Sequence, residues 1–280
     1  MTPAPTHHAR VFGSPWEGVY GTLMDSARHF GKHWHAVYGL GLLEDGAQSS
    51  ASGLGTVQAY AGDLITTNPG EVHDGQPIGG PTRRWRMLYL EPEVMASMAN
   101  DAQAALPHEV ALTRPVIQDP RLSLALQGLL HRLGAWDTHR QSASADALAC
   151  EESLVHTCAL LLQGHASVAC MAPASAAVKQ VRERLPDDPL APPSLTEMAA
   201  MTGLSKYQVL RRFEQAYGVT PHAWLLQQRA ERARRLILSG TDLAQAAAAC
   251  GFADQSHMTR IFARHFGFTP GAWQRIARLA

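Results

Sequence analysis

Short apolar runs separated by turn-forming residues fill the chain from residue 16 to about residue 93. The runs are rich in Val, Leu, Tyr and Gly, and the breaks contain sequences such as Asn68-Pro69-Gly70. This pattern is typical of short antiparallel β-strands. The strongest strand predictions are 37–43, 64–67 and 86–90. Such strands avoid exposed edges by closing into a barrel or a jelly roll, so we expect that fold for the N-terminal part.

Beyond Pro92 the apolar residues follow a helical period. One predicted helix face consists of Leu122, Leu126, Leu129, Leu130 and Leu133, and a second of Leu148, Val155, Ala159 and Leu162. The polar stretch 140–146 predicts a loop between the two helices. Amphipathic helices appended to a barrel pair with a second chain or pack on the barrel, so we expect a homodimer, with core packing as the alternative.

The C-terminal third contains an internal repeat. Residues 213–224 and 262–273 share the same spacing of Phe, Gly, Thr-Pro and Ala-Trp, 49 positions apart. Each copy extends upstream into an Ala-rich helix, a turn with Gly and a polar helix, which is the order of elements in a helix-turn-helix. We therefore predict a domain at 1–168, a linker at 169–176, and an all-α domain at 177–280 with two helix-turn-helix units, 194–216 and 242–266. The whole is an α+β multidomain fold.

Local signals mark the ends of these helices. Ser194 and Glu197 have the spacing of a capping box, and Ser205 can cap the second helix of the first unit. In the second unit Gly251 marks the turn and Asp254 the cap.

The outward-facing residues of the second helix in each unit are the candidates for contact with DNA. A helix in the major groove reads base edges with its N-terminal residues, where Arg pairs with guanine and Gln with adenine. The alternative is that these polar residues are only solvated. The candidates are Tyr207, Leu210 and Arg211 in the first unit, and Gln255, Ser256, His257 and Arg260 in the second.

A helix without Gly or Pro is expected between the two units, at residues 222–238. Roughly 17 helical residues span about 25 Å. A rigid spacer of that length can hold two reading helices near the roughly 34 Å separation of successive major grooves on one face of DNA. Its arginines are candidates for contact with phosphates, or form a solvated face: Arg229, Arg232, Arg234 and Arg235.

Charge divides unevenly along a chain whose formal net charge is zero. Residues 1–172 hold 10 Lys and Arg against 16 Asp and Glu, whereas residues 173–280 hold 14 against 8. A basic C-terminal domain on an otherwise acidic chain indicates a polyanionic partner for that domain alone, with ordinary solvated charge as the alternative.

Other features of the sequence exclude several classes of protein. No apolar run approaches the roughly 20 residues of a membrane span, so we expect a cytoplasmic protein without a membrane partner. The cysteines lack C-x-x-C pairs and the density of a disulfide scaffold, and are expected to be buried thiols. They are Cys150, Cys158, Cys170 and Cys250.

The sequence Gly-Phe-Ala-Asp-Gln-Ser-His-Met-Thr-Arg-Ile-Phe at 251–262, followed by Gly-Phe-Thr-Pro at 267–270, resembles the signature of AraC/XylS-type transcription regulators. The resemblance covers the last hundred or so residues, including a weaker first copy at 205–221. It implies base-reading roles for the seven candidates named above. Leu210 departs from the polar residue frequent at its position, which implies apolar contact with a thymine methyl there.

The N-terminal half resembles, less specifically, the cupin-like effector-binding domain of the same family. The similar residues are His33-Trp34-His35 with Tyr38, and residues 62–73, which end in His73. The resemblance implies a small effector bound inside the barrel, dimerisation through the following helices, and an N-terminal arm that responds to ligand.

Three of these histidines also raise the question of a metal. His33 and His35 would point to one side of a strand, and three imidazoles suffice for a metal site with an open position. Cupin enzymes add a Glu after the first pair, which the stretch 36–41 lacks. We therefore expect no metal, no cofactor and no catalytic residue. The expected role is effector contact by His33, His35, Tyr38, His73 and Trp85, although Tyr38 and Trp85 can be plain core residues.

We thus expect a sequence-specific transcriptional regulator, not an enzyme. Its expected partners are double-stranded promoter DNA, a small-molecule effector and a second copy of the chain, with RNA polymerase as a further candidate. The alternatives are a cupin metal-dependent enzyme or metal sensor fused to a DNA-binding domain, and an architectural DNA-binding protein without a ligand.

Overall fold

The computed structural model describes residues 6–52, 55–101, 110–139, 147–168 and 176–277. The chain divides into two compact units, one formed mainly by residues up to 170 and one mainly by residues from 171. We call them the β-domain and the helical domain and describe each by itself. The predicted linker at 169–176 and the loop at 140–146 lie, except for Ala176, outside the described residues.

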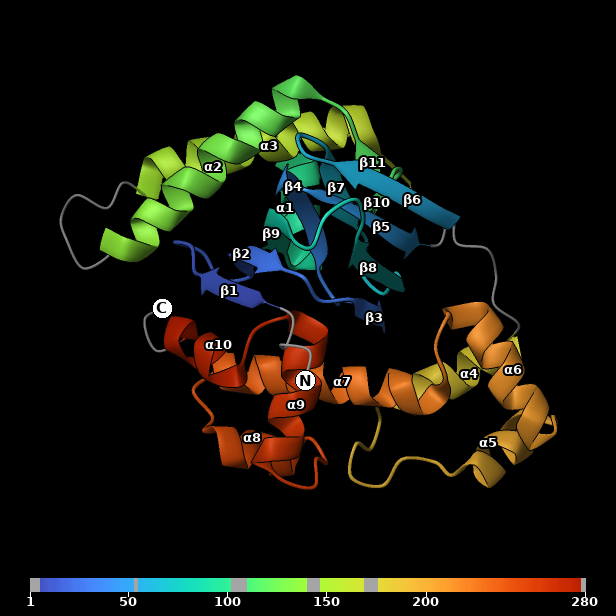
Figure 1. Ribbon diagram of the computed structural model, residues 1–280. Helices are drawn as coiled ribbons and strands as arrows, with labels where there is room; N and C mark the ends of the chain where they lie inside the picture. The colour runs from blue at the N-terminus through green and yellow to red at the C-terminus, as the bar shows by residue number, and fades with distance from the viewer. Residues whose placement is uncertain (1–5, 53–54, 102–109, 140–146, 169–175, 278–280) are drawn as a thin grey trace. The chain divides into compact units, whose positions relative to one another are not determined.

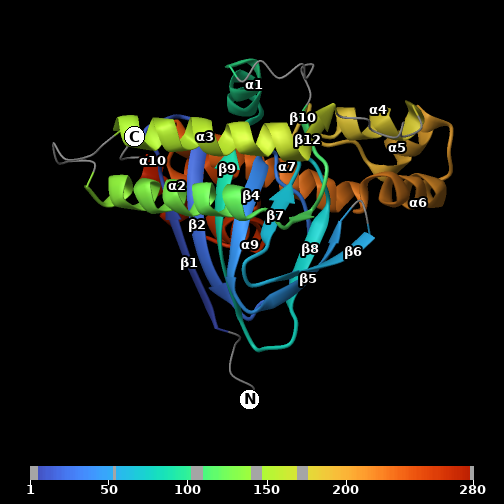
Figure 2. The same ribbon diagram turned by 90° about the horizontal axis from the view of Figure 1, so that it is seen from above.

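The β-domain is built on two sheets, which is the jelly-roll form of the expected fold (Figures 1 and 2). The six-stranded sheet has the order β1-β2-β9-β4-β7-β11, with β1 His7–Phe12, β2 Val19–Ser26, β4 Tyr38–Asp45, β7 Leu64–Thr67, β9 Arg83–Leu90 and β11 Val116–Ile117. The four-stranded sheet has the order β3-β8-β5-β6, with β3 Phe30–His33, β5 Ala47–Ser52, β6 Gly55–Tyr60 and β8 His73–Pro77. A short ladder joins β10 Val110–Leu112 to β12 Ala166–Val168. The three strongest strand predictions are confirmed as β4, β7 and β9.

Helices α2 Pro120–His139 and α3 Ala147–His165 lie side by side across the outer face of the six-stranded sheet, and α1 Pro92–Asp101 contacts α3 and β10 (Figure 2). The leucines predicted for α2 are all at most 2% exposed, and they pack on the outward side chains of β4 and β9, including Leu40 and Leu88. The predicted face of α3 was wrong in part, because Val155 is 44% exposed while Cys150, Leu154 and Leu161 are buried.

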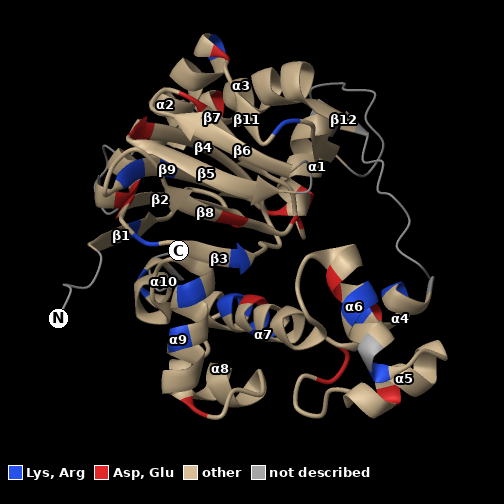
Figure 3. Cartoon of the chain, turned by 45° about the vertical axis from the view of Figure 1, so that its right-hand side comes forward, with Lys and Arg blue, Asp and Glu red and all other residues tan. Residues whose placement is uncertain are grey.

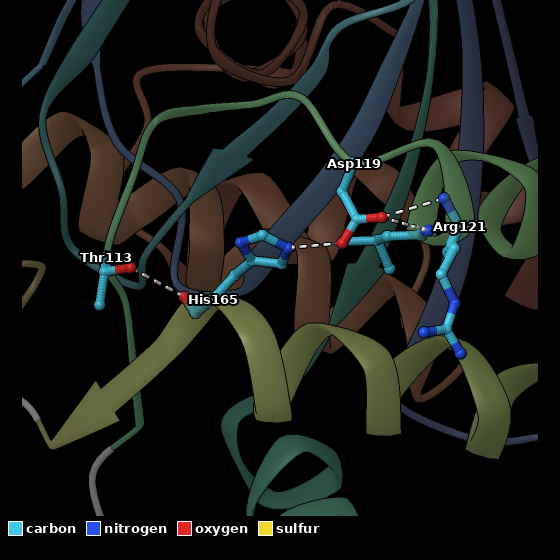
Figure 4. Close-up of polar contacts among 5 residues, drawn as sticks. Thr113, Asp119, Arg121 and His165 are labelled. Atoms are coloured by element: carbon cyan, nitrogen blue, oxygen red, sulfur yellow. Dashed lines mark hydrogen bonds and ion pairs between the residues drawn. The ribbon is translucent and has the colours of Figure 1, made fainter.

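A polar cluster fastens the end of α3 to the start of α2 (Figure 4). Asp119 accepts hydrogen bonds from the backbone N–H groups of Arg121 and Leu122, and its other oxygen lies 2.9 Å from His165 Nε2. The hydrogen bond from His165 is the main reason why the pKa of Asp119 is lowered. Thr113 donates its hydroxyl to the carbonyl oxygen of His165. These bonds fix how the two helices lie on the sheet.

Within residues 176–277, the helical domain contains the helices α4 Ala176–Arg184, α5 Leu195–Thr202, α6 Lys206–Tyr217, α7 Pro221–Leu238, α8 Leu243–Ala249, α9 Gln255–Phe266 and α10 Pro270–Ala277. The predicted caps are present. The side chains of Ser194 and Ser205 each complete a capping box, and Asp254 accepts from the His257 N–H. Helices α5–α6 and α8–α9 are the two helix-turn-helix units, and α7 packs on both α6 and α9.

Two further expectations from the sequence concern the burial of the cysteines and the lack of a membrane-spanning helix. Cys150, Cys158 and Cys250 are buried, and burial raises the pKa of the Cys158 thiol to about 12. Cys170 lies outside the described residues. Among the helices with described positions, all are too short or too polar to span a lipid bilayer.

Candidate functional site

Helix α6 presents its predicted DNA-reading residues to solvent. Val209 and Phe213 are buried, which turns Leu210 and Arg211 outward. Leu210 is 37% exposed, so its side chain lies on the surface of α6. Tyr207 belongs to the helix, but its side chain lies outside the described part.

Helix α9 repeats this arrangement in the second unit. Met258 and Phe262 are fully buried, whereas Gln255, Ser256 and Arg260 are exposed. His257 is half-buried. Its ring stands edge-on to Phe252 at 5.5 Å, and its Nδ1 lies 3.4 Å from the backbone N–H of Ala253, which leaves Nε2 as the nitrogen free of the turn.

The spacer α7 has 18 residues and therefore a length of about 27 Å. One of its four candidate phosphate contacts is wrong. Arg234 is only 2% exposed, lies 2.9 Å from Glu231, and has its guanidinium 5.3 Å from the ring centre of Trp273. Arg229 is also engaged, because it donates to the carbonyl oxygen of Pro189. Arg232 and Arg235 are exposed and remain candidates.

Basic side chains thus occur on both reading helices and on the spacer that they share (Figure 3). The exposed arginines of these elements are Arg211, Arg212, Arg232, Arg235, Arg260 and Arg264. Exposed arginines on helices that also expose hydrogen-bonding residues at their N-terminal ends can bind phosphates and base edges together.

Three of the predicted effector residues come together at β3 and β8. His33 ends β3, His73 begins the adjacent strand β8, and His35 follows β3. Their ligand nitrogens all lie within 4.8 Å of one another. The ring of Tyr89 stands edge-on to His35 at 5.8 Å. This histidine cluster is buried except for His73, which is half-buried.

The hydrogen bond of His73 defines its protonation. Nδ1 lies 2.9 Å from the carbonyl oxygen of Glu71, and because a carbonyl only accepts, Nδ1 carries the proton. Burial lowers the pKa of His73, so its neutral form is favoured. Nε2 is then the nitrogen of the neutral ring that carries the lone pair.

Tyr38 and Trp85 lie on opposite faces of the six-stranded sheet, because successive side chains of a strand point to opposite faces. Tyr38 is on the outer face of β4, in the core with the helices, and its hydroxyl donates to the carbonyl oxygen of Val110. The prediction that Tyr38 shares a pocket with the histidines is therefore corrected. Trp85 faces the other sheet, where its ring stands edge-on to Phe30 of β3 at 6.1 Å.

The structure adds a residue that the sequence did not single out. Arg83 is 1% exposed and lies two positions before Trp85, on the same face of β9. Burial lowers the pKa of its guanidinium to about 10, so Arg83 is charged at neutral pH. The sequence has arginines at positions 83, 84 and 86, and nothing in it indicates which of the three is buried.

Two family models match the chain, one in each unit. Residues 18–157 match the model of an AraC-like ligand binding domain. Residues 198–276 match the model of a helix-turn-helix domain, and this segment contains α6, α7 and α9.

Individual proteins are also similar to this chain. The uncharacterized HTH-type transcriptional regulator YbfI of Bacillus subtilis (strain 168) is 30% identical over 200 residues, which cover 70% of each chain. The transcriptional activator NphR of Rhodococcus sp is 42% identical over 84 residues, 29% of this chain and 24% of NphR. The crystal structure of unsaturated fatty acid bound ToxT from Vibrio cholerae strain SCE256 has the same fold, with a TM-score of 0.50 at 11% identity, over 96% of this chain and 95% of ToxT.

Proposed function

Because this chain belongs to the AraC family of transcriptional regulators, we propose that α6 and α9 read two successive major grooves of a promoter and that the effector binds between the two sheets. The family establishes a DNA-binding regulator with an effector-binding domain. The single observation that supports the proposed reading residues is the repeated exposure of Arg211 and Arg260 on two capped helices that share one spacer. A protein that binds a promoter acts beside RNA polymerase, in the compartment that holds the DNA, which fits a cytoplasmic location.

Arg260→Ala is expected to weaken binding to the cognate operator by about 1–3 kcal/mol and to relax the preference at one base pair. The reason is that Arg260 lies on the exposed face near the start of α9, within reach of a guanine edge. Binding to a library of single-base operator variants measures both effects. Arg264→Ala, one turn later on the same face, is the control and should weaken binding alike on all sequences. An equal loss on every operator with Arg260→Ala would assign that residue to a phosphate.

His73→Ala is expected to abolish the response of DNA binding to the effector while leaving basal DNA affinity within about twofold, because His73 belongs to the proposed effector site and is not one of the DNA-reading candidates. Operator binding with and without effector gives this result. Unchanged effector affinity in the variant would remove His73 from the proposed pocket.

A metal sensor is the second candidate function, and the close approach of three ligand nitrogens supports it. The donor set fits a transition-metal ion, since neutral imidazoles are its usual protein ligands and the carbonyl of Glu71 holds His73 in the tautomer with the proton on Nδ1. The metal content of the same purified wild-type and His73→Ala proteins tells the candidates apart. Stoichiometric metal that the variant lacks would favour the metal sensor over an organic effector held by imidazoles.

We also propose that the protein is a homodimer that pairs through α2 and α3. Leu124 of α2 is 71% exposed and Val155 of α3 is 44% exposed, and both are large apolar residues on helices of the same layer. Leu124→Glu should therefore shift the protein from dimer to monomer, whereas Gln127→Glu, a change to the same charge on the exposed side of α2, should not. Sedimentation velocity measures the result. A monomeric wild type, or an unaffected Leu124→Glu dimer, would contradict this interface.

A further inference from the structure

Arg83 has an unusual set of partners for a buried charge. Its Nε donates to Gln48 Oε1 at 3.0 Å and its Nη1 donates to the carbonyl oxygen of Arg28 at 3.1 Å. The guanidinium carbon lies 4.7 Å from the ring centre of Trp85 and 5.7 Å from that of Phe30. All four partners are electrically neutral groups.

The positive charge of Arg83 is therefore not balanced. In the part of the chain that the structure describes, no carboxylate lies at ion-pair distance from the guanidinium. Burial lowers the pKa of the Arg83 guanidinium, as expected for a buried cation without a paired carboxylate. Buried charges in proteins are normally paired, because an unpaired charge in a low-dielectric interior is costly.

Space is available next to the unpaired side of the guanidinium. Gly75 of β8 faces Arg83, and a Cβ at this position would meet one described heavy atom within 4 Å, Arg83 Nη2, at 3.3 Å. No hydrogen bond from Nη2 to a described residue is present, so its N–H groups can serve a ligand. A planar guanidinium with free N–H groups matches the two oxygens of a carboxylate.

The position of this opening connects it with the effector site. Gly75 lies two residues after His73 on the same face of β8, a separation of about 7 Å along the strand. The rings of Trp85 and Phe30 flank the guanidinium and provide apolar surface for the body of a ligand. The arrangement of one buried cation, aromatic walls and imidazoles at the far side suits a small organic anion.

We propose that Arg83 binds a carboxylate of the effector, so that the regulator responds to an organic acid whose apolar part lies against Trp85 and Phe30. This inference rests on the proposed function, since it assigns a chemical class to the effector of the same domain. Bound carboxylate supplies the counter-charge that the described residues do not.

A structural role for Arg83 as a tie between the two sheets is the competing explanation. Truncating Arg83 would remove its hydrogen bonds to Gln48 and to the Arg28 carbonyl oxygen under either explanation. That variant therefore does not distinguish a structural role from a ligand-binding role. Gln48→Glu does, because it keeps the size of the side chain and places an internal carboxylate where Gln48 Oε1 already accepts from Arg83. Gln76→Glu adds the same charge at an exposed position of β8 and is the matched control.

The test measures the melting temperature of the full chain with sodium benzoate or hexanoate and with their neutral counterparts, benzamide and hexanamide. At least one carboxylate should stabilise the wild type and the Gln76→Glu control, with an apparent affinity about tenfold or more above that of its amide. Gln48→Glu should melt at a higher temperature without ligand and lose the response to carboxylate, because its own side chain pairs with Arg83.

Three results would overturn the assignment: no stabilisation of the wild type by either carboxylate, equal stabilisation by acid and amide, or an undiminished response in Gln48→Glu. Operator binding by the same samples separates this failure from that of the proposed function. Wild-type protein that binds an operator but ignores carboxylates has lost only the anion assignment, whereas protein with no affinity for DNA contradicts the regulator itself.

Discussion

Glu231→Gln is expected to lower the free energy of unfolding of the helical domain by about 3 kcal/mol, although the residue is far from any predicted base contact. Glu231 and Arg234 are 3% and 2% exposed and pair at 2.9 Å. Removing the carboxylate leaves the guanidinium charge buried without this partner. The Trp273 indole N–H also donates to the carbonyl oxygen of Arg234, so the same site fastens α10 to α7.

Urea unfolding followed by tryptophan fluorescence measures this change. Arg232→Gln is the matched control, because it alters an exposed charge on the same helix. It should change stability by less than about 0.5 kcal/mol. If Arg232 contacts a phosphate, its replacement reduces by about one the number of counterions released on DNA binding. This number is obtained from the slope of log K against log salt concentration. Equal stability of Glu231→Gln and wild type would show that Arg234 is not held as the structure has it.

Gly251→Ala is expected to destabilise the second helix-turn-helix unit by about 3 kcal/mol or more. Gly251 has φ = 75°, in the left-handed region, and an added Cβ would overlap the carbonyl oxygen of Pro189. That contact is with backbone, which cannot move aside as the end of a flexible side chain can. Backbone strain and steric overlap therefore add at this turn.

The first unit provides the control for this prediction. Gly203 occupies the corresponding turn with φ = 65°, but a Cβ there would meet nothing within 4 Å. Gly203→Ala should therefore cost only the left-handed strain, about 1 kcal/mol. Thermal unfolding of both variants gives the comparison. Equal losses in the two would mean that the Pro189 contact does not constrain the turn.

The helical domain was predictable because its signals are local. A capping box occupies four consecutive residues, and the outward direction of Arg260 follows from the burial of Met258 and Phe262 within the same helix. The DNA-reading candidates with described side chains are accordingly exposed or half-exposed. Among the phosphate-contact candidates on α7, Arg234 was misassigned, because its burial depends in part on Trp273, which comes from a helix 39 residues later.

The β-domain was less predictable because strand faces are decided by tertiary contacts. The sequence located β4 and β9, but alternation alone does not say which face meets the helices and which meets the other sheet. Tyr38 was therefore assigned to the wrong side, while Arg83 was overlooked among three nearby arginines. Val155 was misplaced for a similar reason, since the apolar residues of α3 exceed one face.

The central claim is that one chain reads two turns of DNA with two equivalent helices. Hydroxyl-radical footprinting on an operator selected from random sequence tests it most directly. The account predicts two protected patches about 10 base pairs apart on one face of the duplex. Arg211→Ala should weaken one patch and Arg260→Ala the other. A single patch that both variants affect alike, or no selected operator at all, would contradict the account.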